Sequence, residues 1–395
     1  MESACGGWID FLFLTYIVIF THEIFLKAKR NCFIVSETRS QMVLRLFYLI
    51  VLLYLFFISI TLMGSAFKFL GKGFAETLLQ TTASPMIGLF IGILATSIVQ
   101  SSSTTTSLTV GIVAAGGLTI EGAIPIVMGA NIGTTITNTL VATAHIYRPE
   151  EMRRAFAVST VHDWFNLFAV IVLFPLQLTT DFIGISSSYL AALFSNVGGM
   201  ELFNPLQAII KLSVELIVNV VGKSGIVLLI IALTLLFLTL RYIVLNLKAL
   251  VIGKIETFFD QILFKTSVRA MLIGLVFTVL VQSSSITTSL VVPLAGAGIL
   301  TIHQIYPYTL GANIGTTVTA MLAAMVTGQI TAVTVAFAHF LFNVFGIIIF
   351  WPLKMIPIYC AEKLAEYSLR SKLIPIGYII TVFFLIPLLL IYLLE

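Results

Sequence analysis

The fold is decided by two stretches of sequence, VQSSSTTTSL at residues 99–108 and VQSSSITTSL at residues 281–290. Each is a row of hydroxyl side chains with one amide, and each lies between apolar segments. Burying a polar group without a hydrogen-bond partner costs about 1–3 kcal/mol in proteins, so such a row needs partners or a ligand. Two rows in an otherwise apolar chain therefore indicate a buried polar site that the sequence builds twice.

The composition places the chain in a membrane. Of its 395 residues, 59% are hydrophobic and 10% are charged, and the mean hydropathy of +1.10 exceeds that of soluble globular domains. The net charge of +4 does not indicate a nucleic-acid partner, because the basic residues gather at the ends of apolar runs. The three cysteines form no CxxC motif and no zinc-type cluster. We expect an all-α polytopic protein of the cell membrane, with the lipid bilayer as its partner.

Seven apolar runs are long enough to cross a bilayer, which takes about 20 helical residues. Two shorter pairs, 86–99 with 104–118 and 268–281 with 286–300, are each interrupted by a QSSS row. Runs of about 14 residues are too short to cross, so each pair predicts a broken re-entrant hairpin. The predicted spans are 43–63, 122–145, 155–177, 225–247, 306–326, 332–352 and 373–394.

The chain contains an internal repeat with a constant offset, since Gln100 corresponds to Gln282 and the motif GANIGTT occurs at 129–135 and again at 311–317. After a five-residue contraction, HDWFN at 162–166 also matches HFLFN at 339–343. The predicted organisation is an N-terminal extension or signal-anchor (1–42), transport repeat 1 (43–177), an extracellular connection (178–224), transport repeat 2 (225–353) and a C-terminal linker with the last membrane helix (354–395). Within the second repeat, 253–265 has apolar residues at helical spacing and predicts an interfacial helix.

Basic residues predict that the two repeats have opposite orientations in the membrane. The first span begins beside Lys27–Arg45, and the loop Arg148–Arg154 lies on the same cytoplasmic side only if the first hairpin re-enters. Equivalent segments then face opposite sides, which is the inverted-repeat plan of secondary transporters. We expect the first hairpin to enter from outside, the second to enter from the cytoplasm, and the two QSSS rows to meet near the bilayer midplane.

Such a meeting point suits a small oxyanion together with alkali cations. A half-helix N-terminus carries roughly half a positive charge and favours an anion. Hydroxyls, backbone carbonyls and side-chain amide oxygens are hard oxygen ligands that suit Na⁺. The amides concerned are Gln100, Gln282, Asn131 and Asn313.

These motifs resemble the type II sodium-phosphate cotransporter family. The resemblance rests on the paired QSSS rows, the paired GANIGTT and RRAFAVSTVHDWFN at 153–166, and it covers roughly residues 43–353. It implies symport of inorganic phosphate into the cell by alternating access, driven by sodium ions. Two departures are visible: Ala312 stands where many members have a serine, and 178–224 lacks the cysteines and glycosylation sequon of animal members. The pattern is therefore similar to a bacterial-type member.

The resemblance also implies roles for individual residues. Asp163 resembles the aspartate that distinguishes electrogenic from electroneutral members. Adding the four amides named above gives two sets of candidates. The candidate substrate-binding residues are Ser101, Ser102, Ser103, Ser283, Ser284, Ser285, Asn131 and Asn313. The candidate sodium ligands are Gln100, Gln282, Thr134, Asp163, Asn166, Thr316 and Thr319.

Simpler structural interpretations stand beside these. Serine and threonine in membrane helices commonly bond to their own helix, although the exact duplication favours a ligand role. The glycines of GANIGTT suit close helix packing as well as they suit a ligand, and His162 and His339 suit structural hydrogen bonds.

Three functional alternatives are weighed. A proton-coupled carrier or a channel for another small oxyanion could use the same hydroxyl rows, but channels are usually rings of repeated subunits. An enzyme would need a nucleophile with a base or a carboxylate pair. The predicted membrane-spanning segments contain few acidic residues besides Asp163. We expect a transporter rather than an enzyme. The preferred oxyanion, the number of sodium ions and the oligomeric state, a homodimer included, stay open.

Overall fold

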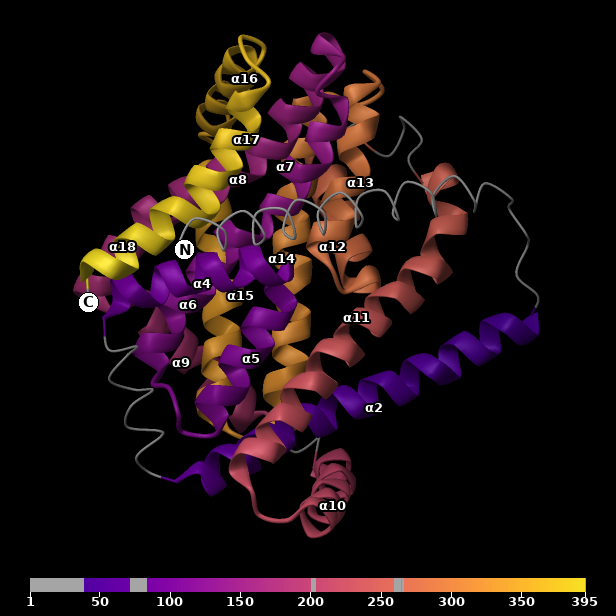
Figure 1. The fold of residues 1–395 in the computed structure, drawn as a ribbon, viewed down its shortest axis with the longest axis vertical. Coiled ribbons are helices and arrows are strands. Elements are labelled where there is room, and N and C mark those ends of the chain that lie inside the picture. Colours follow the sequence, from indigo (N-terminus) through magenta and orange to yellow (C-terminus); the bar gives the residue numbers. More distant parts are fainter. Residues whose placement is uncertain (1–38, 72–83, 200–203, 259–263, 265, 395) are drawn as a thin grey trace, which may run out of the picture. The chain divides into compact units, whose positions relative to one another are not determined.

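Every regular element in the described part of the chain is a helix, so the predicted all-α class is confirmed. The chain divides into two units, Met1–Phe47 and Tyr48–Glu395. The contacts discussed below lie within the second unit, and the first contributes the beginning of one helix. Figure 1 shows the order of the helices. The computed structural model describes residues 39–71, 84–199, 204–258, 264 and 266–394.

Among the described residues, seven helical stretches are long and apolar enough to cross a membrane, and each overlaps a predicted span. The chain is therefore a multi-pass membrane protein. The stretches are α2 (Arg39–Leu70), α6 (Ile120–Thr134) with α7 (Ile136–Ala142) and η1 (Thr143–His145), α8 (Pro149–Thr180), α11 (Gly225–Phe258), α14 (Ile302–Thr327), α15 (Ile330–Phe350), and Leu373–Leu394, which comprises α17 (Leu373–Ile380), the π-helical η3 (Thr381–Leu385) and α18 (Ile386–Leu394).

Each QSSS row falls at a break between two short helices. The first row separates α4 (Pro85–Val99) from α5 (Ser102–Ala114), and the second separates α12 (Ser267–Val281) from α13 (Ser284–Gly296). The longer helices of these pairs have 15 residues, which makes them about 22 Å long. The apolar core of a bilayer is about 30 Å thick, so no single helix of either pair is long enough to cross it.

The two breaks have the same backbone geometry. Gln100 and Gln282 adopt the left-handed conformation, with φ of 56° and 55°, and the serine that follows each is extended, with φ of −152° and −154°. A left-handed conformation costs a non-glycine residue about 1–2 kcal/mol, and backbone strain of this kind gathers at functional sites. The repeat in sequence is therefore also a repeat in conformation.

Close helix packing holds each break. Helix α4 lies along α6, and α12 lies along α14. A Cβ atom on Gly129 of α6 would overlap the carbonyl oxygen of Leu89, and one on Gly311 of α14 would overlap that of Met271. Backbones that approach this closely admit only glycine. The structure thus supports the packing interpretation for these two glycines of the GANIGTT motifs.

The connections add further helices. Helices α9 (Phe182–Asn196) and α10 (Asn204–Val221) lie between the repeats, and α16 (Met355–Ser368) follows the second repeat. The interfacial helix expected at 253–265 does not begin as a separate element, because α11 continues unbroken to Phe258. Six of the remaining residues, 259–263 and 265, lie outside the described part of the chain.

Candidate functional site

The two QSSS rows lie next to each other in the structure. The hydroxyl Oγ of Ser103, in α5, donates to the backbone carbonyl of Gln282 at 3.4 Å, although the two residues are far apart in sequence. The second and third serines of each row are buried, with Ser102 and Ser284 each only 3% exposed. The breaks of the two repeats therefore form one buried polar region.

The serines of each row divide into a capping residue and two helix-starting residues. Ser101 is the N-cap of α5 and accepts a hydrogen bond from the backbone N–H of Thr104 at 3.3 Å. Ser283 accepts one from the N–H of Ile286 at 3.4 Å at the start of α13. The next two serines of each row are the first residues of these helices, whose N–H groups have no partner within the helix. The arrangement offers two adjacent helix N-termini with hydroxyls on both.

Gln282 is held in place by its own helix and by the second GANIGTT helix. Its Oε1 accepts a hydrogen bond from the hydroxyl of Thr319 at 2.7 Å, and its Nε2 donates to the carbonyl of Val279 at 2.6 Å. Two predicted sodium ligands, Gln282 and Thr319, are therefore in direct contact. Gln100 occupies the equivalent left-handed position in the first repeat.

Thr134 and Thr316 occupy equivalent positions in the two GANIGTT motifs and behave alike. The hydroxyl of Thr134 donates to the carbonyl of Ala130 at 2.8 Å, and that of Thr316 donates to the carbonyl of Ala312 at 3.0 Å. Both hydroxyls thus bond back to their own helix, as in the simpler interpretation. Their oxygen lone pairs can still accept a hydrogen bond or bind a cation.

The asparagines of the two repeats are interlocked. Asn313 donates to Oδ1 of Asn166 at 2.8 Å, and Asn343 donates to Oδ1 of Asn131 at 3.2 Å. Asn166 also donates to the backbone carbonyl of Asn131 at 2.9 Å. Each GANIGTT asparagine is therefore bonded to the asparagine that ends the HDWFN or HFLFN motif of the other repeat.

The two histidines at equivalent positions differ in their surroundings. His162 Nε2 lies 2.6 Å from Oδ1 of Asn313, and its Nδ1 lies 3.4 Å from Nδ2 of Asn138. Asn138 in turn accepts a hydrogen bond from Thr288 of α13 at 2.9 Å. His339 is also buried, but neither of its ring nitrogens has a hydrogen-bond partner in the described part of the chain. His162 is thus a structural partner of the predicted kind.

Asp163 is a buried carboxylate whose hydrogen bonds in the described part of the chain go to only one of its two oxygens. Its Oδ2 accepts hydrogen bonds from the hydroxyl of Tyr378 at 2.9 Å and from that of Thr139 at 3.4 Å. Its Oδ1 has no hydrogen-bond partner among the described residues. A buried carboxylate oxygen that the protein leaves unpaired is suited to bind a cation.

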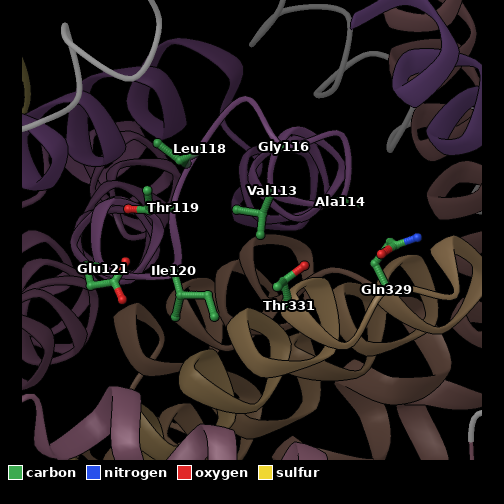
Figure 2. A pocket seen from close by; sticks show the side chains of 9 residues that line it. All are labelled: Val113, Ala114, Gly116, Leu118, Thr119, Ile120, Glu121, Gln329 and Thr331. Atoms are coloured by element: carbon green, nitrogen blue, oxygen red, sulfur yellow. The ribbon is translucent and has the colours of Figure 1, made fainter. Parts of the chain in front are cut away.

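A cavity of about 390 Å³ lies away from this polar region, between the end of α5, the start of α6 and the start of α15 (Figure 2). Its polar lining consists of Thr119, Glu121, Gln329 and Thr331. Figure 2 shows Glu121 and Gln329 on opposite sides of it. None of the predicted phosphate or sodium residues lines this cavity, so it is separate from the candidate site.

Comparison with known proteins fits this geometry. The family model described as Na⁺/Pi-cotransporter matches residues 55–203 and 235–351, which include both QSSS rows, both GANIGTT motifs and HDWFN. The chain belongs to the Na⁺/Pi-cotransporter family. No solved structure gives a significant match.

Relatives in this family include mammalian transporters. Sodium-dependent phosphate transport protein 2B of Homo sapiens is 32% identical over 92% of this chain and 66% of its own length. The 2B protein of Pongo abelii is 32% identical over 87% of this chain, and the 2A protein of Rattus norvegicus is 32% identical over 85%. The chain spans somewhat less than two thirds of the length of the Pongo and Rattus relatives, at 64% and 65%.

Several residues of this family member were missed by the sequence reasoning. Asn343 could have been found, because HFLFN aligns with HDWFN and ends in the same amide. Asn138 and Thr139 follow the first GANIGTT motif, where the two repeats no longer match. Tyr378 gave no signal, because it lies beyond both repeats and beyond the residues that the family model matches.

Proposed function

We propose that this Na⁺/Pi-cotransporter family member carries inorganic phosphate into the cell together with sodium ions, by alternating access. The observation behind the proposal is the contact between the two QSSS breaks, Ser103 with Gln282. Each break presents a helix N-terminus with unpaired N–H groups and roughly half a positive charge. Two such termini side by side favour an anion. The name of the relatives, sodium-dependent phosphate transport protein, supports phosphate as that anion.

In this proposal the phosphate is held by the serines that begin α5 and α13. Their hydroxyls and N–H groups donate to its oxygens, while Ser101 and Ser283 keep the helix ends in shape by capping them. Hydrogen bonds to an anion are charge-assisted and stronger than neutral ones. The serines that bind phosphate directly are Ser102, Ser103, Ser284 and Ser285. Asn131 and Asn313 complete the polar surroundings through the interlocked amides.

Sodium ions occupy positions built from neutral oxygens and one carboxylate. Gln282 and Thr319 already contact each other, which supports a shared role. Asp163 supplies a negative charge, with Oδ1 lacking a partner among the described residues, so an additional sodium there would make transport electrogenic. The other proposed sodium ligands are Gln100, Thr134, Asn166 and Thr316.

Alternating access follows from the repeat. The two breaks share one backbone geometry, and each GANIGTT asparagine bonds to the opposite repeat. The two broken pairs are α4 with α5 and α12 with α13. If the repeats are inverted in the membrane, opening one broken pair exposes the site to one side, and opening the other exposes it to the opposite side. The proposal therefore includes re-entrant pairs, the first reached from outside and the second from the cytoplasm.

The test is uptake of radiolabelled phosphate by the purified full chain in proteoliposomes. An inward sodium gradient should drive accumulation above equilibrium, whereas an equal potassium gradient should not. Inward positive current should accompany uptake when the potential is clamped. Accumulation driven by a pH gradient without sodium would favour the proton-coupled alternative. Equilibration without accumulation under any ion gradient would favour a channel.

A further inference from the structure

The last membrane-spanning stretch, Leu373–Leu394, reaches the candidate site through a polar contact. The hydroxyl of Tyr378, in α17, donates to Oδ2 of Asp163 at 2.9 Å. This contact joins two residues more than 200 positions apart. The helix that carries Tyr378 lies outside both repeats and outside the residues that the family model matches. The residue that donates to Asp163, the predicted sodium ligand, thus lies in a part of the chain outside both repeats.

The tyrosine ring packs against two other aromatic rings, which restrict the direction of its hydroxyl. Tyr378 makes an edge-on contact with Phe156 of α8, with ring centroids 6.0 Å apart, and another with Phe383 of η3 at 6.2 Å. Phe383 is fully buried in the cluster that also contains Leu89 and Phe90 of α4. Edge-on aromatic pairs of this kind are stabilising beyond their buried area. The packing leaves the hydroxyl little freedom to turn away from Asp163.

The hydrogen bonds to Asp163 leave one of its two carboxylate oxygens available to bind a cation. Tyr378 and Thr139 both donate to Oδ2, and Oδ1 is left without a partner among the described residues. Two donors on the same oxygen fix the plane of the carboxylate. A carboxylate held in one orientation with one open oxygen is a preorganised cation ligand, and ligands held by outer partners bind more tightly than free ones.

We propose that Tyr378 is a positioning residue for sodium coupling, which acts by holding the Asp163 carboxylate with Oδ1 open toward the cation. The proposal rests on the proposed function, since it needs sodium to bind at Asp163. It also explains an asymmetry between the repeats. The residue that matches Asp163 in HFLFN is Phe340, so the second repeat offers no carboxylate for such a donor. The C-terminal helix therefore completes one half of the site only.

The test compares Tyr378→Phe with Tyr306→Phe in proteoliposomes. Tyr378→Phe keeps the ring contacts and removes the hydroxyl. Tyr306→Phe removes another buried hydroxyl, which donates to the carbonyl of Phe350 at 3.2 Å, and leaves Asp163 untouched. Tyr378→Phe should raise the sodium concentration for half-maximal phosphate uptake by about tenfold. The phosphate KM at saturating sodium should stay as in the wild type, and Tyr306→Phe should match the wild type in both.

A double-mutant cycle with Asp163→Asn separates positioning from a general structural effect. In the Asp163→Asn background, Tyr378→Phe should change the sodium dependence no further, because the carboxylate that it positions is gone. Thr139→Val removes the weaker donor to the same oxygen and should shift sodium dependence in the same direction by less. It gives a second reading if Tyr378→Phe is poorly folded.

The outcomes distinguish the two proposals. A Tyr378→Phe protein with wild-type sodium dependence would overturn the role of Tyr378 while leaving sodium-phosphate transport standing. An equal effect of Tyr378→Phe with and without the Asp163 carboxylate would also overturn it. A wild-type protein that shows no sodium-dependent uptake would overturn both proposals together.

Discussion

Ser102 and Ser284 are equivalent residues, each the first of its half-helix and each 3% exposed. If one phosphate lies between the two helix N-termini, losing either hydroxyl removes a charge-assisted hydrogen bond worth about 1.5–3 kcal/mol. Ser102→Ala and Ser284→Ala should therefore each weaken phosphate binding between about tenfold and about a hundredfold. The concentration dependence of uptake at saturating sodium measures this.

Ser289 supplies the matched control for this pair. It lies in the same helix as Ser284, but its hydroxyl donates to the carbonyl of Ile286 at 3.0 Å, within the helix. Ser289→Ala should leave the phosphate dependence unchanged. Wild-type affinity in either Ser102→Ala or Ser284→Ala, with the protein folded and inserted, would contradict a site shared by both rows.

At the level of elements, α4 packs closely against α6, and α12 packs closely against α14. Gly129 and Gly311 each face a carbonyl oxygen of the neighbouring helix with no room for a Cβ atom. Either helix would have to move to accept alanine, and overpacking of this kind costs about 1–3 kcal/mol. Gly129→Ala and Gly311→Ala should each lower the Tm of the purified protein in detergent. The displaced helix would also disturb the QSSS break that it holds.

Gly64 gives the opposite expectation for the same change. It lies within α2, and a Cβ atom there would meet nothing within 4 Å. Glycine inside a helix costs about 0.5–1 kcal/mol relative to alanine, so Gly64→Ala should keep or raise the Tm. Equal effects at Gly64 and Gly129 would show that close packing is not what these motif glycines provide.

The sequence predicted elements better than contacts, and the reason is physical. Apolar run length located the seven spans found among the described residues, because a bilayer fixes how many residues a helix needs. The QSSS rows located both breaks, because buried hydroxyls mark where the backbone leaves the helix. The run at 253–265 was misjudged, since periodicity does not show where α11 ends. Tyr378 could not be predicted, because an isolated tyrosine in an apolar helix carries no sign of the residue that it will meet.

Across the molecule, the repeats share their backbone pattern and differ in their polar groups. The asparagines pair between the repeats at equivalent positions, and in both pairs the asparagine of the second repeat donates. The histidines and the position of Asp163 break that symmetry, because His162 has two side-chain partners and Phe340 replaces the acid in the second repeat. In the proposed transporter, the shared backbone pattern would let the site open toward either side, and the single carboxylate at Asp163 would let the two repeats contribute differently to sodium binding.

The inverted orientation of the repeats is tested by labelling equivalent residues. Ala115 and Ala297 are the C-caps of α5 and α13 and lie at matching positions. Ala297 is exposed and Ala115 is half-buried, so cysteine at either place is a small change. In a chain whose three native cysteines are replaced by serine, Ala115→Cys should react with a membrane-impermeant maleimide added outside. Ala297→Cys should react only when the reagent reaches the cytoplasmic side.

Two exposed loop residues fix the sidedness of the assay. Gln329 lies in the uncharged loop between α14 and α15, which the distribution of basic residues predicts to be outside, and Arg148 begins the basic segment predicted to be cytoplasmic. Gln329→Cys should therefore label with Ala115→Cys, and Arg148→Cys with Ala297→Cys. If Ala115→Cys and Ala297→Cys instead label from one face while the loop residues label from opposite faces, the broken pairs are not inverted. Both QSSS breaks would then open to the same side of the membrane. Alternating access would have to arise by a movement other than opening the two broken pairs in turn.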